Sequence, residues 1–350
     1  MLMKGNEAIG EAAIRAGCQA YFAYPITPQN ELGEYMARRM PEEGRVFLQA
    51  ESEVAAINMV YGAAGAGVRV MTSSSSPGIS LKQEGISYLA GAELPAVIVN
   101  MVRGGPGLGS IQPAQSDYFQ ATKGGGHGDY RLIVFGPSTI QELVDLTGLA
   151  FELADKYRNP VMILGDGALG QMMEPVEFPD KDEVKLPPKP WATTGMKGRP
   201  QNVINSLHLD PEDLDRHNRH LQEKYREIAA REVRYEIEHE DADYFLVAYG
   251  TTARVARNAM NKAREEGHRV GLIRPITLWP FPDVAFEKVI GRAKAFLTVE
   301  MSAGQMVEDV RLAVNGRVPV RFYGRMGGVI PSQREIYEAL LKMIQGGEKA

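Results

Sequence analysis

The sequence predicts an α/β protein made of two successive units, and three observations point to this fold class. From the start to about Gly165, short apolar runs alternate with longer segments rich in helix formers, and this alternation is typical of a parallel β-sheet. The run Ala96–Met101 is apolar on both faces, as a strand covered by helices on either side should be. Strand–helix alternation then resumes at Tyr244, after a stretch of prolines and charged residues.

The elements of the first unit follow from this pattern. Its expected strands, which are short and apolar, are Tyr21–Tyr24, Val46–Gln49, Val68–Thr72, Ala96–Met101, Leu132–Phe135 and Val161–Leu164. Its expected helices, which are rich in helix formers, are Glu31–Arg39, Glu51–Gly65, Ile79–Gly91 and Thr139–Tyr157. Together these segments predict a parallel sheet with helices on both faces.

Residues 179–243 are expected to connect the two units. Prolines, lysines and glycines dominate from Phe178 to Pro200, which indicates a linker rather than regular structure. The charged segment Pro211–Asp243 carries apolar residues at helical spacing, namely Leu214, Leu221, Tyr225 and Ile228. We expect a solvated helix that packs through one stripe, with a subunit-contact helix as the alternative.

The second unit is expected to span residues 244–350. A strand that begins at Tyr244 runs into a turn and the helix Ala253–Glu266, which Gly267 ends. The remaining expected elements are the strands Val270–Ile273, Ala295–Val299 and Val320–Tyr323 and the closing helix Ser332–Ile344.

Composition limits the class of protein. A chain of 350 residues can bury two cores, and its net charge of -5 gives no electrostatic reason to expect nucleic acid or membrane as a partner. No apolar run reaches the roughly 20 residues of a membrane span, and the polar start argues against a signal peptide, so we expect a cytoplasmic protein. Cys18 is the only cysteine, which excludes an internal disulfide or a cluster held by this chain alone. We expect it to be buried on the first helix.

Three motifs in the first unit carry a resemblance to a known family. They are Tyr24-Pro25-Ile26-Thr27-Pro28, Gln49-Ala50-Glu51-Ser52-Glu53-Val54-Ala55-Ala56 and Val102-Arg103-Gly104-Gly105-Pro106. Together they resemble the pyrimidine-binding (PYR) domain of thiamine-diphosphate enzymes, most closely that of the 2-oxoacid:ferredoxin oxidoreductases. The resemblance implies a parallel-sheet thiamine-diphosphate PYR-type domain over residues 1–178.

The second unit is similar to the C-terminal domain of transketolase-like enzymes. The segments that carry this similarity are Leu246–Thr251, Ile273–Pro282 and Val299–Met306. The resemblance thus implies a PYR-like domain (1–178), a Pro/Lys-rich linker with a charged helix (179–243) and a transketolase C-terminal-like α/β domain (244–350). In detail the chain resembles most closely the corresponding subunit of the branched-chain 2-oxoacid:ferredoxin oxidoreductases, with the 2-oxoglutarate enzymes close behind.

Glu53 is the candidate catalytic residue. Thiamine diphosphate reacts through C2 of its thiazolium, and its own 4'-amino group removes the C2 proton only as the imino tautomer, which needs a carboxyl group that shares a proton at N1'. A glutamate that opens an apolar helix suits this role, although an acidic residue at a helix N-terminus also has a purely structural explanation. The resemblance assigns the role to Glu53, and Glu51 is the competitor.

Arg103 and Thr27 are the candidate substrate-binding residues. Arg103 ends an apolar strand, and parallel sheets bind ligands at that edge. Its planar guanidinium can hold a carboxylate through two hydrogen bonds. The alternatives are a surface arginine in a mobile turn and, for Thr27, a rigid turn set by its flanking prolines. The resemblance implies that Arg103 grips the 2-oxoacid carboxylate and that Thr27 hydrogen-bonds the substrate.

Other residues in these loops are candidate contacts with the cofactor or coenzyme A: Pro25, Ile26, Ser74, Ser75, Gly104, Gly105 and His127. The serines lie between a strand and a helix, where they would hold an anion or cap the helix. The glycines let backbone amides approach a ligand. The loop Gly124–Asp129 resembles one found in this subclass, and a catalytic role and a loop-stabilising hydrogen bond are both open for its histidine.

Gly165-Asp166-Gly167 looks like the start of a magnesium motif but is not expected to be one. Other thiamine enzymes hold the diphosphate through magnesium with such a triplet and an asparagine about 25–30 residues later. Here that interval falls on Trp191–Lys197, which contains no asparagine. We therefore expect Asp166 to be structural and assign no metal to this chain.

The resemblance implies one half of a thiamine site in a multi-subunit enzyme. Its reaction decarboxylates a 2-oxoacid, passes two electrons to external ferredoxin and forms an acyl-coenzyme A. Partner chains would then supply what this chain lacks: a β subunit with the pyrophosphate domain and Mg²⁺, a γ subunit, and a ferredoxin-like δ subunit with [4Fe-4S] clusters.

Three alternatives stay open at this point. The 2-oxoglutarate enzyme is one, although residues 107–111 add no basic residue for a second carboxylate, which favours an apolar substrate such as 2-oxoisovalerate. A 2-oxoacid dehydrogenase or transketolase-type subunit shares the domain order, but the motifs at Thr27 and Arg103 favour the ferredoxin enzymes. A noncatalytic scaffold is the third, and the presence of Glu53 argues against it.

Overall fold

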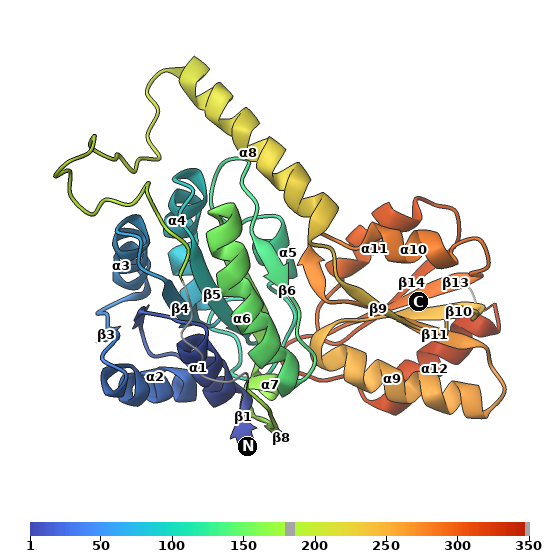
Figure 1. Ribbon diagram of the computed structural model, residues 1–350. Coiled ribbons are helices and arrows are strands. Elements are labelled where there is room, and N and C mark those ends of the chain that lie inside the picture. Colours follow the sequence, from blue (N-terminus) through green and yellow to red (C-terminus); the bar gives the residue numbers. More distant parts are fainter. Residues whose placement is uncertain (179–185, 347–350) are drawn as a thin grey trace.

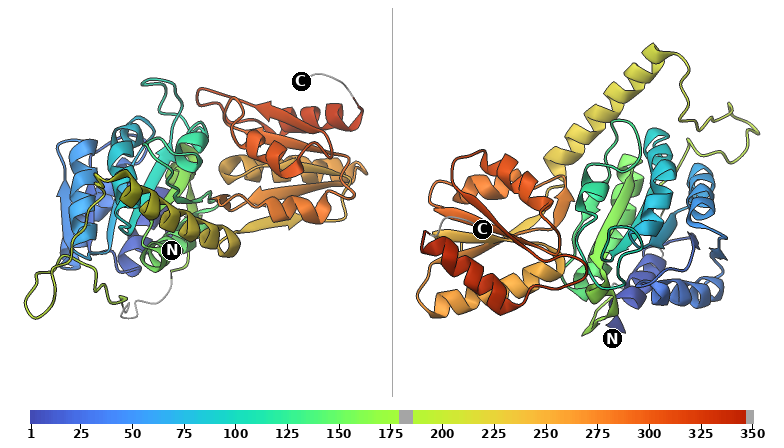
Figure 2. Two further views of the ribbon diagram at one scale, coloured as in Figure 1. Left: turned by 90° about the horizontal axis from the view of Figure 1, so that it is seen from above. Right: turned by 180° about the vertical axis from the view of Figure 1, so that it is seen from behind.

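The computed structural model describes residues 1–178 and 186–346. It contains a seven-stranded sheet, a five-stranded sheet and a two-stranded ribbon. The first two form separate layered units that lie side by side, and both views in Figure 2 show this arrangement. Pro179, where the linker was expected to begin, and the last four residues of the second expected domain lie outside the described residues.

The first unit is the expected parallel sheet. Its strands, in spatial order, are β12 (Thr277–Trp279), β6 (Ile133–Phe135), β7 (Pro160–Asp166), β5 (Ala96–Val102), β4 (Val70–Ser74), β2 (Ala20–Ala23) and β3 (Val46–Gln49). All neighbours are parallel except β12, which is antiparallel to β6. The central strands β4, β5 and β7 are buried at every residue, which explains why β5 reads as a continuous apolar run.

Helices cover both faces of this sheet. They are α1 (Gly5–Arg15), α2 (Asn30–Glu42), α3 (Glu53–Gly65), α4 (Pro77–Gly91), α5 (Tyr118–Thr122), α6 (Ile140–Tyr157) and α7 (Gly167–Gln171). Helix α1 packs against α2 and α6, and α3 packs against α4 (Figure 1). The ribbon pairs β1 (Leu2–Lys4) with β8 (Met173–Pro175) and so closes the unit beside α1.

The second unit repeats this architecture on a smaller scale. Its strands, in spatial order, are β14 (Val320–Gly324), β13 (Ala295–Glu300), β10 (Tyr244–Val247), β11 (Val270–Pro275) and β9 (Tyr235–Glu238). Its helices are α9 (Gly250–Glu265), α10 (Asp283–Val289), α11 (Met306–Val314) and α12 (Gln333–Ile344). Helix α9 packs with α12, and α10 packs with α11.

The region between the units differs from the expectation. Helix α8 (Pro211–Arg231) ends twelve residues before Asp243, and the strand β9 follows it. Glu232 is buried where the helix ends and accepts hydrogen bonds from Lys156 and Tyr157. A helix over the whole of 211–243 was therefore a wrong prediction. The packing stripe is confirmed for Leu221, Tyr225 and Ile228, whereas Leu214 is exposed.

The two sheets also exchange strands across the expected boundaries. β9 precedes residue 244 but pairs with β11 of the second sheet. β12 follows residue 244 but pairs with β6 of the first sheet. The division at 178 and 243 stays a prediction about domains, and the sheets themselves interleave across it. Cys18 is buried as expected, but it lies in the turn after α1 rather than on that helix.

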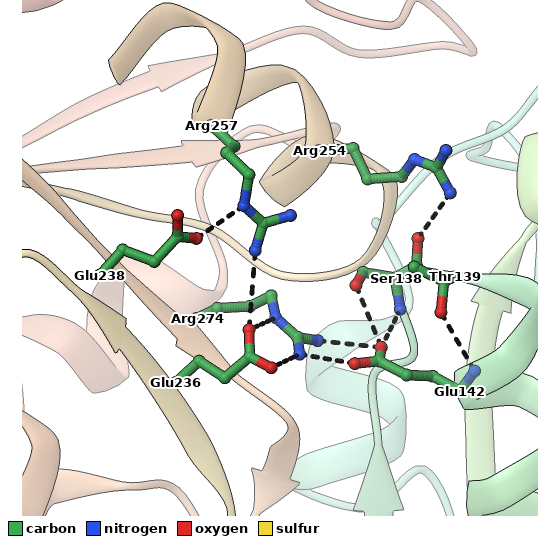
Figure 3. A network of polar contacts seen from close by, with 8 residues as sticks. All are labelled: Ser138, Thr139, Glu142, Glu236, Glu238, Arg254, Arg257 and Arg274. Atoms are coloured by element: carbon green, nitrogen blue, oxygen red, sulfur yellow. Dashed lines mark hydrogen bonds and ion pairs between the residues drawn. The ribbon is translucent and has the colours of Figure 1, made fainter. Parts of the chain in front are cut away.

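An ionic network around the buried Arg274 joins the units (Figure 3). Arg274 of β11 is 1% exposed, and its Nη1 and Nη2 donate to Glu142 of α6 at 3.0 and 2.6 Å. Its Nε donates to Glu236 of β9 at 2.9 Å. Both neighbouring carboxylates hold the pKa of Arg274 above its ordinary value, although burial acts in the opposite direction. Arg254 of α9 donates to the Ser138 carbonyl at 3.1 Å.

Candidate cofactor and substrate site

The predicted site residues gather at one edge of the first sheet. In the sheet, β2 and β4 are neighbours. After β2 the chain continues to β3 on one side of this pair, whereas after β4 it continues to β5 on the other side. The loops after β2 and β4 therefore diverge and leave a crevice, and open parallel sheets bind ligands at such a switch point. Thr27 follows β2, Glu53 follows β3, Ser75 follows β4 and Arg103 follows β5.

Glu53 is the first residue of α3 and is 7% exposed, whereas Glu51 is exposed. Ser52 caps this helix, because its hydroxyl accepts a hydrogen bond from the Ala55 amide at 3.2 Å. The carboxylate lies against Gly78, where an added Cβ would lie 2.8 Å from Glu53 Oε1. A glycine at that position is therefore needed to leave room for the carboxylate.

Ser74 and Ser75 are buried, and neither hydroxyl has a hydrogen-bond partner in the described part of the chain. The capping explanation does not hold for α4. Its N-cap residue Ser76 makes no side-chain capping bond, and the Ser76 hydroxyl accepts from the Arg103 amide at 3.0 Å instead. Ser76 also has a φ of 23°, and non-glycine residues with such strained backbone angles concentrate at functional sites.

Asn100 and Asp117 connect this loop to its neighbours. The Asn100 side-chain oxygen accepts from the Ser76 amide at 3.1 Å, and its amide nitrogen donates to Asp117 at 2.9 Å. Burial raises the pKa of the Asp117 carboxyl. Neither residue was singled out from the sequence, because nothing in its local pattern marks it.

Arg103 and Thr27 meet although 76 residues separate them in the sequence. Arg103 is 9% exposed, and its Nη1 donates to the Thr27 carbonyl at 3.0 Å, while Nη2 donates to the Leu108 carbonyl at 3.2 Å. Its Nε has no partner among the described residues. The Thr27 hydroxyl accepts a long bond of 3.4 Å from Asn30. The Nε edge of the guanidinium is thus buried and makes no hydrogen bond within the described residues.

The two glycines after Arg103 have different surroundings. A Cβ on Gly104 would lie 2.8 Å from the Gly327 carbonyl carbon, so this glycine lets a loop of the second unit approach the site. A Cβ on Gly105 would meet nothing within 4 Å. Only Gly105 therefore retains the open space that a backbone contact with a ligand requires.

Pro25 and Ile26 lie beside this crevice. Pro25 lines a cleft of about 310 Å³ between α2 and β3, together with the aromatic side chains of Tyr21, Tyr24 and Phe47. Ile26 is half-buried.

His127 lies apart from Glu53 and Arg103. Its loop packs on the second half of α4, where Gly125 and Gly126 approach Gln83 and Ser87 closely. The His127 ring is exposed and contacts the Tyr88 ring edge-on, with centroids 6.5 Å apart. No hydrogen bond involves it in residues 1–178 and 186–346. The expectation of a loop-stabilising hydrogen bond was therefore wrong, and the contact is aromatic.

Lys82 was missed by sequence reasoning. It lies on α4, is fully buried, and donates to the Thr72 hydroxyl at 2.7 Å and the Ser73 carbonyl at 2.9 Å. Burial lowers the pKa of Lys82 to about 7, and the charge of Glu53 acts in the opposite direction. Nothing in its local sequence pattern marks it as buried, because its burial depends on neighbours from other elements.

Asp166 has the structural role that was expected. It is buried and caps α7 by accepting hydrogen bonds from the Ala168 and Leu169 amides at 2.9 and 3.2 Å. Burial raises the pKa of its carboxyl. Within the described ranges no group of three or more His, Cys, Asp or Glu side chains is arranged to hold a metal ion. None of the described helices combines the length and the apolar character needed to cross a membrane.

Gln115, in the segment of the first unit that follows β5, makes hydrogen bonds to the second unit. The Gln115 amide nitrogen donates to the Tyr249 carbonyl at 2.9 Å, and its oxygen accepts from the Thr252 hydroxyl and the Met301 amide, both at 3.0 Å. Met301 follows Glu300, whose buried carboxylate accepts from the Met306 and Val307 amides and so fixes the start of α11.

Comparison with known proteins adds to this geometry. The family described as "Pyruvate flavodoxin/ferredoxin oxidoreductase, thiamine diP-bdg" matches residues 11–237, and "Pyruvate:ferredoxin oxidoreductase core domain II" matches residues 242–336. The ketoisovalerate oxidoreductase subunit VorB of Methanothermobacter thermautotrophicus is 54% identical and covers 97% of this chain and 96% of its own length. The 2-oxoglutarate synthase subunit KorA of the same organism is 37% identical, with coverage of 97% and 98%.

Solved structures support the same fold. A 2-oxoglutarate:ferredoxin oxidoreductase from Magnetococcus marinus, with 2-oxoglutarate, coenzyme A and succinyl-CoA bound, superposes with a TM-score of 0.88 at 27% identity. The match covers 99% of this chain but 65% of that one, so this chain spans about two thirds of it. A split-gene transketolase matches at a TM-score of 0.63 and 15% identity over 98% of both chains, a likeness of fold alone.

Proposed function

The chain belongs to the 2-oxoacid:ferredoxin oxidoreductase family, and on that premise we propose that it is the PYR-domain subunit of a branched-chain 2-oxoacid enzyme. The proposed reaction converts 2-oxoisovalerate and coenzyme A into an acyl-coenzyme A and CO₂ while ferredoxin is reduced. The observation that carries this substrate assignment is the 54% identity to ketoisovalerate oxidoreductase subunits, against 37% for a 2-oxoglutarate synthase subunit.

The alternatives have less support. A 2-oxoglutarate enzyme remains the second candidate because KorA subunits match along nearly the whole chain. A transketolase or 2-oxoacid dehydrogenase subunit rests only on a fold likeness at 15% identity. A noncatalytic scaffold does not account for a buried Glu53 beside two buried hydroxyls that lack partners.

The residues of the crevice fit thiamine diphosphate. The Ser74 and Ser75 hydroxyls and the Arg103 Nε are buried without partners in the described structure, and buried polar groups are costly unless something bonds to them. Gly78 lets the Ser74 hydroxyl and the Glu53 carboxylate approach its backbone closely, because an added Cβ would lie 2.1 Å from Ser74 Oγ and 2.8 Å from Glu53 Oε1. When bound, the cofactor supplies the carbon nucleophile that attacks the 2-oxo group.

Each residue then has a defined task. Glu53 would hold a proton at N1' of the aminopyrimidine, for which its buried position at the start of α3 is suited. The free edge of Arg103 would bind the carboxylate of the 2-oxoacid. Thr27, whose carbonyl already positions the Arg103 guanidinium, would contact the substrate through its hydroxyl.

Partner chains would complete the enzyme. A single buried cysteine cannot ligate an iron–sulfur cluster, and the one Gly-Asp-Gly triplet is used to cap a helix. We therefore place Mg²⁺ and the pyrophosphate domain on a β subunit and the [4Fe-4S] clusters on a ferredoxin-like δ subunit, with a γ subunit completing the complex.

Purification of the native complex and an assay of ferredoxin reduction test this proposal. With coenzyme A present, kcat/KM should be highest for 2-oxoisovalerate, lower for pyruvate and lowest for 2-oxoglutarate. A preference for 2-oxoglutarate would replace the substrate assignment by the second candidate. A complex that reduces no ferredoxin with any 2-oxoacid would overturn the activity itself.

A further inference from the structure

The Asn100 side chain connects two loops beside the candidate site, and the proposed function assigns it no task. Asn100 lies on β5, a strand in which every residue is buried, and is itself 0% exposed. Burying an amide costs free energy unless hydrogen bonds replace those lost to water. Both ends of this amide are bonded, because Oδ1 accepts from the Ser76 amide at 3.1 Å and Nδ2 donates to Asp117 at 2.9 Å.

These two partners fix the orientation of the Asn100 amide. The Ser76 N–H can only donate, so it requires the carbonyl end, whereas the Asp117 oxygen accepts and so faces the NH₂ end. A leucine of similar size would lose both hydrogen bonds. An aspartate would place two acceptor groups against each other. Asparagine is therefore suited to hold Ser76 and Asp117 at the same time.

Ser76 transmits this constraint to Arg103. The Ser76 hydroxyl accepts from the Arg103 amide at 3.0 Å and donates to the Arg103 carbonyl at 3.3 Å, so one side chain holds both backbone groups. The place of this hydroxyl depends on the Ser76 backbone, whose φ of 23° is unfavourable for a residue with a side chain. The bond from Asn100 to the Ser76 amide favours this conformation, and without it the turn can relax and move the hydroxyl.

The Arg103 residue is thus held at both of its ends. At the tip, Nη1 donates to the Thr27 carbonyl and Nη2 donates to the Leu108 carbonyl. At the backbone, the Ser76 hydroxyl holds the amide and carbonyl groups. Nε lies between these two anchors and has no partner among the described residues. The position of Nε therefore depends on both anchors.

We propose that Asn100 is a positioning residue for binding of the 2-oxoacid: through Ser76 it sets where the Arg103 guanidinium meets the substrate carboxylate. This inference rests on the proposed function, which gives Arg103 the task of binding that carboxylate. Asn100 acts through Ser76 and needs no contact with the substrate. Loss of Asn100 should therefore weaken binding of every 2-oxoacid alike and slow the reaction of bound substrate much less.

Steady-state kinetics of the complex that carries the variant chain test this role. Asn100→Leu should raise the KM for 2-oxoisovalerate and for 2-oxoglutarate by roughly ten- to a hundredfold, the scale of a displacement of about 1 Å in a positioned site, while kcat should change much less. Asn159→Leu is the matched control, since Asn159 is also 0% exposed but donates to the Arg131 and Pro160 carbonyls at the opposite edge of the sheet. It should lower stability without changing KM.

Two further variants separate positioning from a loss of packing. Asn100→Asp combined with Asp117→Asn exchanges the two groups, so that a carboxyl oxygen at 100 accepts from the Ser76 amide and an amide at 117 donates to it. This exchanged pair should bring KM back close to the native value. Ser76→Ala removes only the hydroxyl that holds Arg103 and should raise KM as Asn100→Leu does. Combining these two substitutions should raise KM no further, because both break one chain of contacts.

Hydrogen exchange of the isolated full-length chain tests the same contacts without any activity. Mass spectrometry with fragmentation to single residues compares the Arg103 amide with the Val99 amide, which lies in the middle of β5 and reports on the strand as a whole. In Asn100→Leu and in Ser76→Ala the Arg103 amide should exchange roughly tenfold faster relative to Val99, the scale of one lost hydrogen bond. The exchanged pair and Asn159→Leu should keep the native ratio.

Each outcome bears on one of the two proposals. A native KM in Asn100→Leu, an equal rise in Asn159→Leu or no recovery in the exchanged pair would overturn the role of Asn100. If Asn100→Leu does not fold, Ser76→Ala decides, and a native KM there would refute the link to Arg103. If the native complex reduces ferredoxin with no 2-oxoacid, the proposed function fails, and the exchange rates still decide whether Asn100 holds Arg103 in place.

Discussion

Glu51 and Glu53 are two residues apart, yet only Glu53 is buried against Gly78 and α4. Glu53→Gln should leave the fold intact and lower turnover by roughly 10²–10⁴-fold, because an amide cannot share a proton with N1'. Glu51→Gln, which changes an exposed side chain, should have little effect. Deuterium exchange at C2 of the bound cofactor measures this step directly, and the opposite ranking of the two variants would assign the role to Glu51.

Arg103 is held by two backbone carbonyls and keeps Nε free. Arg103→Lys keeps the charge but loses the planar fork, and a charge-assisted contact contributes about 1.5–3 kcal/mol. Apparent affinity for 2-oxoacids should therefore fall by roughly ten- to a hundredfold, with cofactor affinity nearly unchanged.

Steady-state kinetics with pyruvate, 2-oxoisovalerate and 2-oxoglutarate measure the effect of Arg103→Lys. Arg38→Lys, an exposed position on α2, is the matched control and should behave as native. A loss confined to 2-oxoglutarate would mean that Arg103 binds the distal carboxylate, and the preference for a branched-chain substrate would then be wrong.

Lys82 also predicts how stability depends on pH. Its folded-state pKa of about 7 lies below the ordinary value of 10.5, so the unfolded chain binds more protons between these two values. The free energy of unfolding of the native chain should therefore rise with pH across this window, while the full cost of burying the ammonium persists below about pH 7.

Lys82→Met combined with Glu53→Leu removes this cost together with the buried carboxylate whose charge acts on Lys82, and should stabilise the fold by roughly 1–4 kcal/mol near pH 7, as apolar replacements of buried pairs of opposite charge often do. The gain should shrink as the pH approaches about 10, because the native lysine is then neutral in the folded state. Urea midpoints at the two pH values measure both effects. A variant less stable than native at neutral pH would show that the hydrogen bonds of Lys82 outweigh its burial.

Residues of the candidate site could be predicted where a motif marked them. The motifs placed Thr27 and Arg103 in one candidate site, and the structure brings the Arg103 guanidinium to the Thr27 carbonyl and buries Glu53 rather than Glu51, while the roles of these residues stay predictions. Lys82 could not be predicted in the same way, because burial of a charged residue on an otherwise ordinary helix depends on which tertiary neighbours surround it. The contact of His127 could not be predicted for a related reason, because the Tyr88 ring that it meets belongs to α4, far from it in the sequence.

At the scale of elements, the parallel strands were predictable and the antiparallel ones were not. Buried strands such as β5 show continuous apolar runs, whereas β9 carries two glutamates and β12 has three residues. Both depend on partners far along the chain, β11 for β9 and β6 for β12. Local sequence contains no information about such pairing. For this reason the helix predicted for the charged segment 211–243 wrongly included the residues of β9.

The junction between the units predicts the effect of Gln115→Leu. The substitution removes three hydrogen bonds to the second unit and leaves the buried Met301 amide without its side-chain partner. A buried unsatisfied group costs roughly 1–3 kcal/mol, so the urea midpoint should fall accordingly. Gln120→Leu, on α5 and bonded only to Ser80 within the first unit, is the control and should have a smaller effect. Equal losses would mean that the junction contributes no more than an ordinary contact.

At the scale of the whole molecule, the proposed function treats the chain as one half of a thiamine diphosphate site. The crevice at the edge of the first sheet has unpaired hydroxyls and a free guanidinium edge, but no group of metal-type ligands for a diphosphate–magnesium complex occurs in the described residues. The second unit fixes the loop after β5 through Gln115 and Gly104, so it supports the site without closing it. Under the proposed function, a partner subunit would provide the rest of the cofactor site.

The isolated chain should therefore bind thiamine diphosphate weakly and show no oxidoreductase activity. Glu53 and the serine hydroxyls can contact one end of the cofactor, but the charged diphosphate and its Mg²⁺ would remain in water and contribute little to affinity. Adding the partner chain that carries the pyrophosphate domain should create tight, magnesium-dependent binding. Isothermal titration of the chain alone and of the reconstituted complex compares the two states. Tight, magnesium-dependent binding by the chain alone would mean that it carries a diphosphate site of its own, and the proposed division of the cofactor site between two subunits would be wrong.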